Sequence, residues 1–210
     1  DLIGCNDGAL GHQLIEKKEC NVTGFEINED QVKYDLDAFV KCNLNDDLPE
    51  INYDDLDFVV MLDVIEHLKD PEKFLNELYS KLSNNSKVKI LISTPNISFF
   101  LIRLMLFFGS FNYGKRGILD KTHTRLFTFG SFSKLISGAN FKIIKTEGLP
   151  APFPLAIGHN IFSKFLLKIN KNLIFFFKSL FSYQILMEIQ PNPSLELLLK
   201  RAQEKAKANN

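Results

Sequence analysis

Apolar positions along the chain form short continuous runs that alternate with helical patterns. Five of the runs are typical of β-strands: Val22–Ile27, Leu56–Leu62, Lys87–Ser93, Phe141–Glu147 and Tyr183–Ile189. The middle runs are apolar at nearly every position, which suits strands buried on both faces of a parallel sheet.

Helical spacing fills the stretches between these runs. Leu10, Leu14 and Ile15 predict a helix directly after the opening loop. Asp70 followed by Pro71 predicts the start of another, because Asp caps a first turn and Pro fits the first helical position. Regular alternation of strand and helix indicates a doubly wound α/β sheet.

The length of the chain suits one substantial domain. A third helix is expected from Thr128 to about Gly138, on the same 3.6-residue spacing. We expect one domain over residues 1–192, with a helical insertion at 155–181. Residues 193–210 read as a C-terminal helical tail.

Composition narrows the function classes. Lys and Arg together number 25, as do Asp and Glu, so net charge gives no argument for nucleic-acid binding. Cys5, Cys20 and Cys42 lack pairing or metal-type spacing and read as reduced thiols of a cytoplasmic protein. No other residue set has metal-ligand spacing, so no metal is expected. Ile97–Phe108, the longest apolar stretch, contains Arg103 and falls short of the roughly 18–20 residues of a membrane span.

The chain opens on "DLIGCNDGALG", a loop with glycines at positions 4, 8 and 11. A Gly-rich turn after a strand lets the backbone approach a ligand, although the same turn also occurs without one. The spacing is not GxGxxG, which disfavours a nicotinamide dehydrogenase. Because almost nothing precedes the loop, we expect that most of the first strand is missing and that the chain is a fragment.

Glu26 ends the first complete predicted strand. An acidic residue there can accept hydrogen bonds from both hydroxyls of a ribose, in nicotinamide and S-adenosylmethionine enzymes alike. The alternative is a solvated carboxylate at a strand end. Glu26 therefore indicates an adenosine ligand without identifying it.

The segment "DFVVMLDVIEHLKDPEKFL" (Asp57–Leu75) distinguishes these ligands. It resembles class I S-adenosylmethionine-dependent methyltransferases, whose first motif looks like "LDIGCGDG" and whose fourth strand is commonly followed by "DVLEHLPDP". Ser93–Thr128 is similar to a further signature of methyltransferases found with bacterial surface-polysaccharide assembly. The resemblance runs from Asp1 to about Pro154. It implies a Rossmann-like, mostly parallel seven-stranded sheet of order 3-2-1-4-5-7-6, truncated in strand 1.

The resemblance also implies a set of cofactor-binding residues. The glycine loop would wrap the amino-acid part of S-adenosylmethionine, Glu26 would bind the ribose, and Ile27 would lie beside the adenine. Asn43 stands where the family often has an Asp bonded to the adenine amino group. The full expected set is Gly4, Cys5, Asp7, Gly8, Glu26, Ile27, Asn43, Leu62, Asp63 and His67.

Two departures from the family pattern affect the loop. The acidic residue before the loop falls on Leu2, so either Asp1 replaces it or its contact with the cofactor is missing. The middle glycine falls on Asn6, which tolerates left-handed backbone better than other non-glycine residues.

A hydroxyl acceptor of the methyl group would benefit from a base, and His suits that role near neutral pH. In "DKTHTRLFT" we expect His123 as the base, Asp120 as the residue that orients it, and Arg125 as a ligand for an anionic acceptor. The alternative is a structural loop whose His and Arg bond backbone carbonyls.

Residues 161–181 read as a basic amphipathic helix with a break near Asn170–Asn172. Its lysines fall in one sector and its Ile, Leu and Phe residues in the opposite one. Such a helix either packs over the sheet and the acceptor pocket or contacts an anionic membrane surface.

These observations predict S-adenosylmethionine-dependent O-methylation of a sugar, a glycolipid or another small molecule. We expect a cytoplasmic enzyme, peripheral at the inner membrane surface if residues 161–181 bind lipid. The alternatives are methylation of a quinone precursor or carboxylic acid, and a binding module with weakened catalysis.

Overall fold

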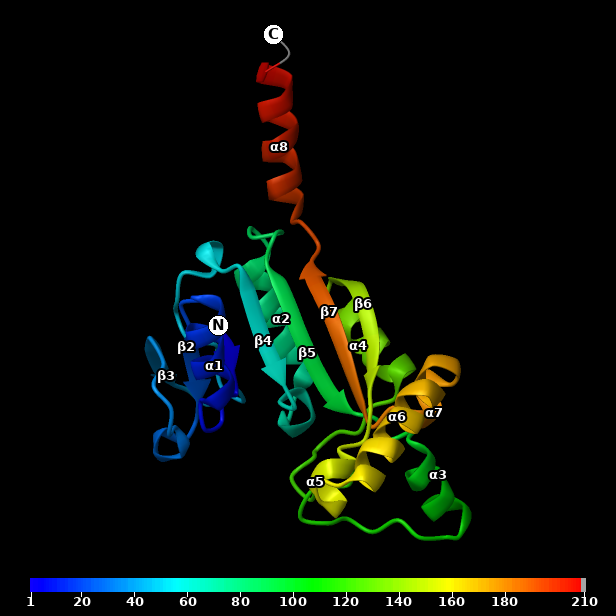
Figure 1. Cartoon of the computed structure of the whole chain (residues 1–210). Helices are drawn as coiled ribbons and strands as arrows, with labels where there is room; N and C mark the ends of the chain where they lie inside the picture. Colours follow the sequence, from blue (N-terminus) through cyan, green and yellow to red (C-terminus); the bar gives the residue numbers. More distant parts are fainter. Residues whose placement is uncertain (209–210) are drawn as a thin grey trace.

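The computed structural model describes residues 1–208, which form one seven-stranded sheet flanked by helices (Figure 1). The strand order is β3-β2-β1-β4-β5-β7-β6, which confirms the order expected from the sequence. β7 runs antiparallel to β5 and β6, and the other pairs are parallel. The strands are β1 (Leu2–Ile3), β2 (Thr23–Glu26), β3 (Ala38–Lys41), β4 (Phe58–Leu62), β5 (Lys89–Pro95), β6 (Phe141–Leu149) and β7 (Gln184–Pro191).

Helices cover both faces of the sheet and extend beyond its two ends. They are α1 (Ala9–Lys18), α2 (Pro71–Leu82), α3 (Phe100–Phe107), α4 (Phe129–Gly138), α5 (Phe153–Ile157), α6 (Ile161–Phe176), α7 (Lys178–Phe181) and α8 (Leu195–Ala208). Short 3₁₀ turns add η1 (Glu29–Gln31), η2 (Tyr53–Asp55) and η3 (Ile65–His67). Of the expected tail, Asn209 and Asn210 lie outside the described residues.

The predicted helix starts are confirmed in detail. The Asp70 side chain accepts a hydrogen bond from the Lys73 backbone N–H at 2.8 Å, with Pro71 at the first helical position. Thr128 and Ser131 form a reciprocal capping box at the start of α4. Both helices turn an apolar stripe onto the sheet, so the main core fixes the positions of the strand ends.

A helical lobe, made of α3, α5, α6 and α7, lies beyond the carboxyl ends of β4 and β5 (Figure 1). It has a small core of its own around Phe99, Ile118 and Ala151. The buried Asn96, which follows β5, ties the lobe to the sheet by donating to the carbonyls of Ser179 and Ser182 at 2.8 Å each.

Within the described residues, no helix combines the length and the hydrophobicity needed to cross a bilayer.

The expected break near Asn170–Asn172 is wrong. α6 continues through these residues to Phe176, and Phe177, with ψ 63°, is its C-cap. Asn170 is buried, and its side chain accepts from the Ala151 N–H and donates to the Phe181 carbonyl, both at 2.9 Å. A polar residue inside the helix therefore bonds across the lobe and leaves the helix unbroken.

Replacing Asn170 by Ala should destabilise the protein by about 2–4 kcal/mol, because two backbone groups lose their partner in a buried place. Thermal and urea unfolding would measure the change. Asn172→Ala is the matched control, since Asn172 is exposed and should change stability by less than about 0.5 kcal/mol. Equal effects of the two substitutions would contradict this account of Asn170.

Candidate functional site

The loop after β1 turns through three residues in the left-handed region. Gly4 has φ 67°, Asn6 has φ 51° and Gly8 has φ 83°, so Asn6 adopts the conformation expected of it. The Gly4 N–H donates to the Phe25 carbonyl at 2.9 Å, which fixes the loop over the end of β2. A Cβ at position 4 would lie 2.5 Å from Val64 Cγ2, so this close approach requires glycine.

A cavity of about 530 Å³ opens beside this loop, at the carboxyl ends of β1, β2 and β4. This is the end where open α/β sheets bind ligands. Its lining includes seven of the ten expected cofactor residues: Gly4, Glu26, Ile27, Asn43, Leu62, Asp63 and His67.

The other three expected cofactor residues, Cys5, Asp7 and Gly8, do not line the cavity and instead shape the loop. Cys5 is buried beneath it. The Asp7 carboxylate accepts from the Ala9 N–H at 3.1 Å, and Gly8 is the N-cap of α1. The glycine-loop motif thus supplies a backbone shape at these positions.

Glu26 presents its carboxylate at the cavity. It accepts from the backbone N–H groups of Asn6 at 3.1 Å and Ile27 at 2.8 Å. Because a carboxylate has about four acceptor positions, two remain for a ligand. Ile27 and Leu62 leave 55% and 39% of their surfaces exposed in the same cavity, so its walls offer apolar area as well.

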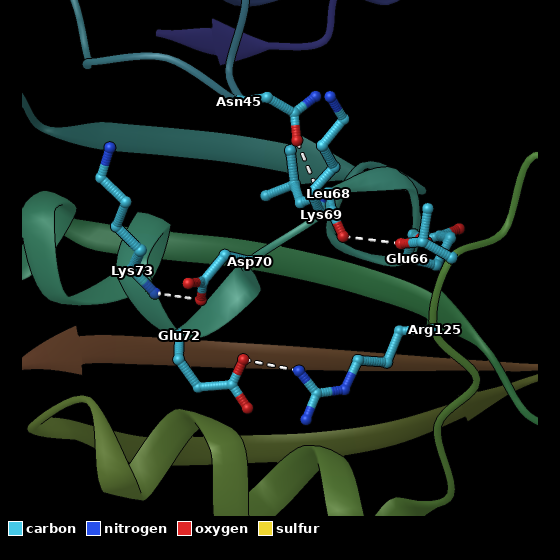
Figure 2. Close-up of polar contacts among 9 residues, drawn as sticks. Asn45, Glu66, Leu68, Lys69, Asp70, Glu72, Lys73 and Arg125 are labelled. Carbon is cyan, nitrogen blue, oxygen red and sulfur yellow. Dashed lines mark hydrogen bonds and ion pairs between the residues drawn. The ribbon is translucent and has the colours of Figure 1, made fainter.

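Asn43 and Asn45 close the rim of the cavity. The Asn43 side-chain oxygen already accepts from the Asn45 backbone N–H at 3.1 Å, so an adenine contact would share that oxygen. Asn45 in turn accepts from the Lys69 N–H at 2.8 Å, as Figure 2 shows. Sequence reasoning missed Asn45, although it lies only two residues after Asn43.

Asp63 ends β4 with φ 57°, a left-handed position that is uncommon outside glycine. Its carboxylate accepts from the Ser93 hydroxyl at 3.0 Å and from the Gln184 amide at 2.6 Å. One side chain therefore joins the adjacent ends of three strands at the edge of the cavity.

Asp1 does not replace the acidic residue that is missing at Leu2. Leu2 is buried, and Asp1 is absent from the cavity lining. The Asp1 carbonyl accepts from the Val60 N–H at 2.8 Å, in the middle of β4 and away from its carboxyl end.

The loop that carries His123 is clamped onto η3 by Thr124. The Thr124 N–H and hydroxyl donate to the Glu66 carbonyl at 2.8 and 3.0 Å, and the hydroxyl also lies 2.6 Å from the Leu68 carbonyl. As a result the rings of His67 and His123 meet edge to face, with centroids 4.8 Å apart.

Backbone carbonyls orient both of these histidines. His67 Nδ1 bonds the Thr122 carbonyl at 3.2 Å, and His123 Nδ1 bonds the Ile118 carbonyl at 2.9 Å. Because a carbonyl only accepts, each Nδ1 carries the proton and each Nε2 keeps a lone pair.

The expectation that Asp120 orients His123 is wrong. The Asp120 carboxylate instead accepts from the Thr122 N–H at 2.8 Å and the Thr122 hydroxyl at 2.7 Å. These bonds hold the pKa of Asp120 below its ordinary value, and the positive charge that His123 can carry adds to the effect.

Glu66 lies beside the two histidines and was assigned no role from the sequence. Only 1% of its surface is exposed, and apart from the Thr94 hydroxyl nearby its carboxyl oxygens have no hydrogen-bond partner among the described residues. Burial, together with the nearby charge of Asp63, raises the pKa of Glu66 to about 8. Its position inside the quoted "EHL" motif was the available signal.

The Arg125 side chain, expected to bind an anionic acceptor, pairs with another residue of the protein. Its guanidinium forms an ion pair with Glu72 at 2.6 Å, and Figure 2 shows the side chain extending toward the start of α2. Arg125 lines a separate hollow beside α4 and not the cavity with Glu26. The structure therefore does not bring Arg125 to the site with His67 and His123.

Comparisons with known proteins agree with this geometry. Residues 3–146 match the model of a family described as a methyltransferase domain. None of the curated proteins matches the sequence.

Solved structures share the fold at low sequence identity. An S-adenosylmethionine-dependent methyltransferase from Archaeoglobus fulgidus is 21% identical over 91% of this chain and 84% of its own, with a TM-score of 0.56. A possible histamine N-methyltransferase from Thermotoga maritima is 16% identical over 91% and 81%, with a TM-score of 0.58. Magnesium protoporphyrin IX methyltransferase from Synechocystis PCC 6803, with bound S-adenosylhomocysteine, is 15% identical over 91% and 72%, with a TM-score of 0.52.

The family match spans the glycine loop, the cavity and the loop of His123, and the sheet has the strand order expected of this fold. The chain therefore belongs to the family of S-adenosylmethionine-dependent methyltransferase domains.

Proposed function

We propose that the protein transfers a methyl group from S-adenosylmethionine to a hydroxyl oxygen of a sugar or glycolipid held at a membrane surface. The observation that carries the proposal is the contact of His123 with His67, which lines the cavity, while the bond of His123 Nδ1 to the Ile118 carbonyl leaves Nε2 for the acceptor.

The residues present fit the cofactor. A volume of about 530 Å³ falls within the usual range of small-molecule sites, roughly 300–1,000 Å³. Glu26 would bind the ribose hydroxyls with its two remaining acceptor positions, and Ile27 would cover one face of the adenine. The backbone at Gly4 would approach the amino-acid part, with Leu62 and Asp63 near the sulfonium.

S-adenosylmethionine supplies an electrophilic methyl group on a sulfonium. When bound, it would pass that methyl group to the hydroxyl oxygen of the acceptor, with the electron pair of the broken carbon–sulfur bond left on sulfur. His123 Nε2 would take the hydroxyl proton, while the Ile118 carbonyl keeps the other ring nitrogen protonated. The remaining contribution of the protein is alignment of the two reactants.

A base such as His123 favours a hydroxyl as the methyl acceptor over a carboxylic acid. A carboxylic acid is already ionised near neutral pH and has no proton for a base to remove. The phenol of a quinone precursor would also use a base, so the acceptor panel below includes one. A binding module with weakened catalysis, the other alternative, would show no affinity for the cofactor.

The surface of the helical lobe supports the proposal that the acceptor is held at a membrane. Several of its large apolar side chains are between 62% and 88% exposed: Phe107, Phe108, Leu155, Ile161, Phe162, Phe175 and Phe176. The apolar sector predicted for α6 thus faces outward, and the buried face is the one with Ser163 and Asn170. Exposed apolar area on this scale marks an interaction surface.

The basic residues of the lobe indicate which kind of surface it would bind. Residues 97–119 and 149–183 contain no Asp or Glu, and their seven basic residues are Arg103, Lys115, Arg116, Lys164, Lys168, Lys171 and Lys178. In a chain of zero net charge this is a strong local excess. Exposed apolar side chains beside basic ones suit an anionic lipid surface.

Glu26→Ala should weaken binding of S-adenosylhomocysteine by about 10- to 100-fold, because charge-assisted hydrogen bonds to the ribose are lost. Titration calorimetry measures the affinity. Glu26→Gln keeps an acceptor for the Asn6 N–H and should lose less. The exposed Glu29→Ala is the control and should bind normally. Unchanged affinity in Glu26→Ala would rule out its ribose role.

His123→Ala should lower turnover about 10²- to 10⁴-fold and leave the affinity for S-adenosylhomocysteine unchanged. Transfer of a radiolabelled methyl group to hexoses, polyprenyl-linked sugars and a phenolic quinone precursor would measure turnover. His159→Ala, in the exposed lobe, should behave as wild type. A parallel loss of turnover and cofactor affinity would count against a base.

The protein should co-sediment with phosphatidylglycerol vesicles and much less with phosphatidylcholine vesicles. Replacing Lys164, Lys168 and Lys171 by Ala should weaken binding about 100-fold, at roughly 1 kcal/mol for each lysine near an anionic surface. A control with Lys17, Lys18 and Lys142 replaced changes the net charge equally and should bind as wild type. No binding, or an equal loss in the control, would refute the lipid-binding surface.

A further inference from the structure

We propose that Glu66, His67 and His123 form a binding site for one divalent transition-metal cation. One ligand atom from each residue lies within 4.8 Å of the other two. The spacing along the chain predicts no metal site, because His123 is far from "EHL" in sequence. The Thr124 hydrogen bonds bring the two segments together.

The two imidazoles have the hydrogen bonding of metal-ligating histidines. Such residues nearly always donate their second ring N–H to a carbonyl or carboxylate, which fixes the tautomer and the ring orientation. His67 and His123 both do so, through Thr122 and Ile118. Each therefore offers an Nε2 lone pair.

The carboxylate of Glu66 is the second, independent observation. It is almost fully buried, and apart from the nearby Thr94 hydroxyl, which acts to lower its pKa, its oxygens have no hydrogen-bond partner among the described residues. A buried polar group without a partner is costly, so its retention needs an explanation. A cation supplies the missing partner, and the nearby charge of Asp63 favours a cation further.

The donor set selects the kind of cation. Two imidazoles and one carboxylate match the ligands of zinc and neighbouring transition metals, whereas Mg²⁺ prefers oxygen ligands alone. Three protein ligands leave a fourth position for another oxygen. With bonds of about 2.1 Å, two ligands of a tetrahedral ion lie about 3.4 Å apart, so a cluster spread over as much as 4.8 Å must contract on binding. His67 is exposed, and its ring can move toward the ion if its bond to the Thr122 carbonyl adjusts.

The inference deepens the proposed function and rests on it for the place of the site beside the cofactor cavity. A bound cation lowers the pKa of a hydroxyl at its open position. In the metal-bound protein the proton of that hydroxyl would be released to solvent, and His123 would serve as a ligand of the cation. In the metal-free protein His123 would remain the base proposed above.

Calorimetric titration of the chelator-treated protein with ZnCl₂ tests the site directly. We expect one Zn²⁺ per chain, and we expect Co²⁺ in its place to give the visible absorption bands of a tetrahedral site. Glu66→Gln preserves volume and should weaken zinc binding at least tenfold. His159→Ala removes an exposed histidine outside the cluster and should bind zinc as wild type.

Titration with S-adenosylhomocysteine on the same samples separates this inference from the proposed function. Absence of stoichiometric zinc binding, or equal affinity in wild type and Glu66→Gln, would overturn the metal site. Normal binding of S-adenosylhomocysteine in such a sample would leave the proposed function standing. If Glu66→Gln loses its native circular dichroism, His67→Ala, at an exposed position, provides the same comparison.

Discussion

The hydrogen bonds of Thr124 to the carbonyls of Glu66 and Leu68 are the constraint on which the site depends. They join two segments more than fifty residues apart in sequence. On one side lies the turn after β4, which borders the cofactor cavity. On the other lies the loop that returns from α3. Together with the bond between His67 Nδ1 and the Thr122 carbonyl, this contact fixes the position of His123 relative to His67.

The shape of the cofactor cavity depends on backbone conformation more than on side chains. Gly4, Asn6 and Asp63 all adopt left-handed φ angles around one cavity. Such positions are strained for most residues and persist only where the surroundings fix them. Here the Phe25 carbonyl holds the loop, and Ser93 and Gln184 hold Asp63. The antiparallel β7 thus helps to shape a pocket that the parallel strands build.

The strand order was predictable from the family resemblance, and most of the cavity residues were predictable because they stand at the ends of strands. Glu26 ends β2, and Gly4 and Asp63 directly follow β1 and β4. The partners of long polar side chains were not predictable. Arg125 pairs with Glu72 and Asp120 with Thr122, and both choices depend on where the loop lies in space. Asn170 shows the same limit, since its partners come from other segments of the lobe.

The C-terminal helix α8 projects from the end of the sheet opposite to the helical lobe and the cofactor cavity (Figure 1). An affinity tag or a sensor-chip linkage attached through α8 would therefore leave the helical lobe and the cavity accessible. The molecule can be immobilised in one orientation, with the helical lobe toward solution. That polarity makes α8 the natural anchoring point for surface-based measurements on this protein.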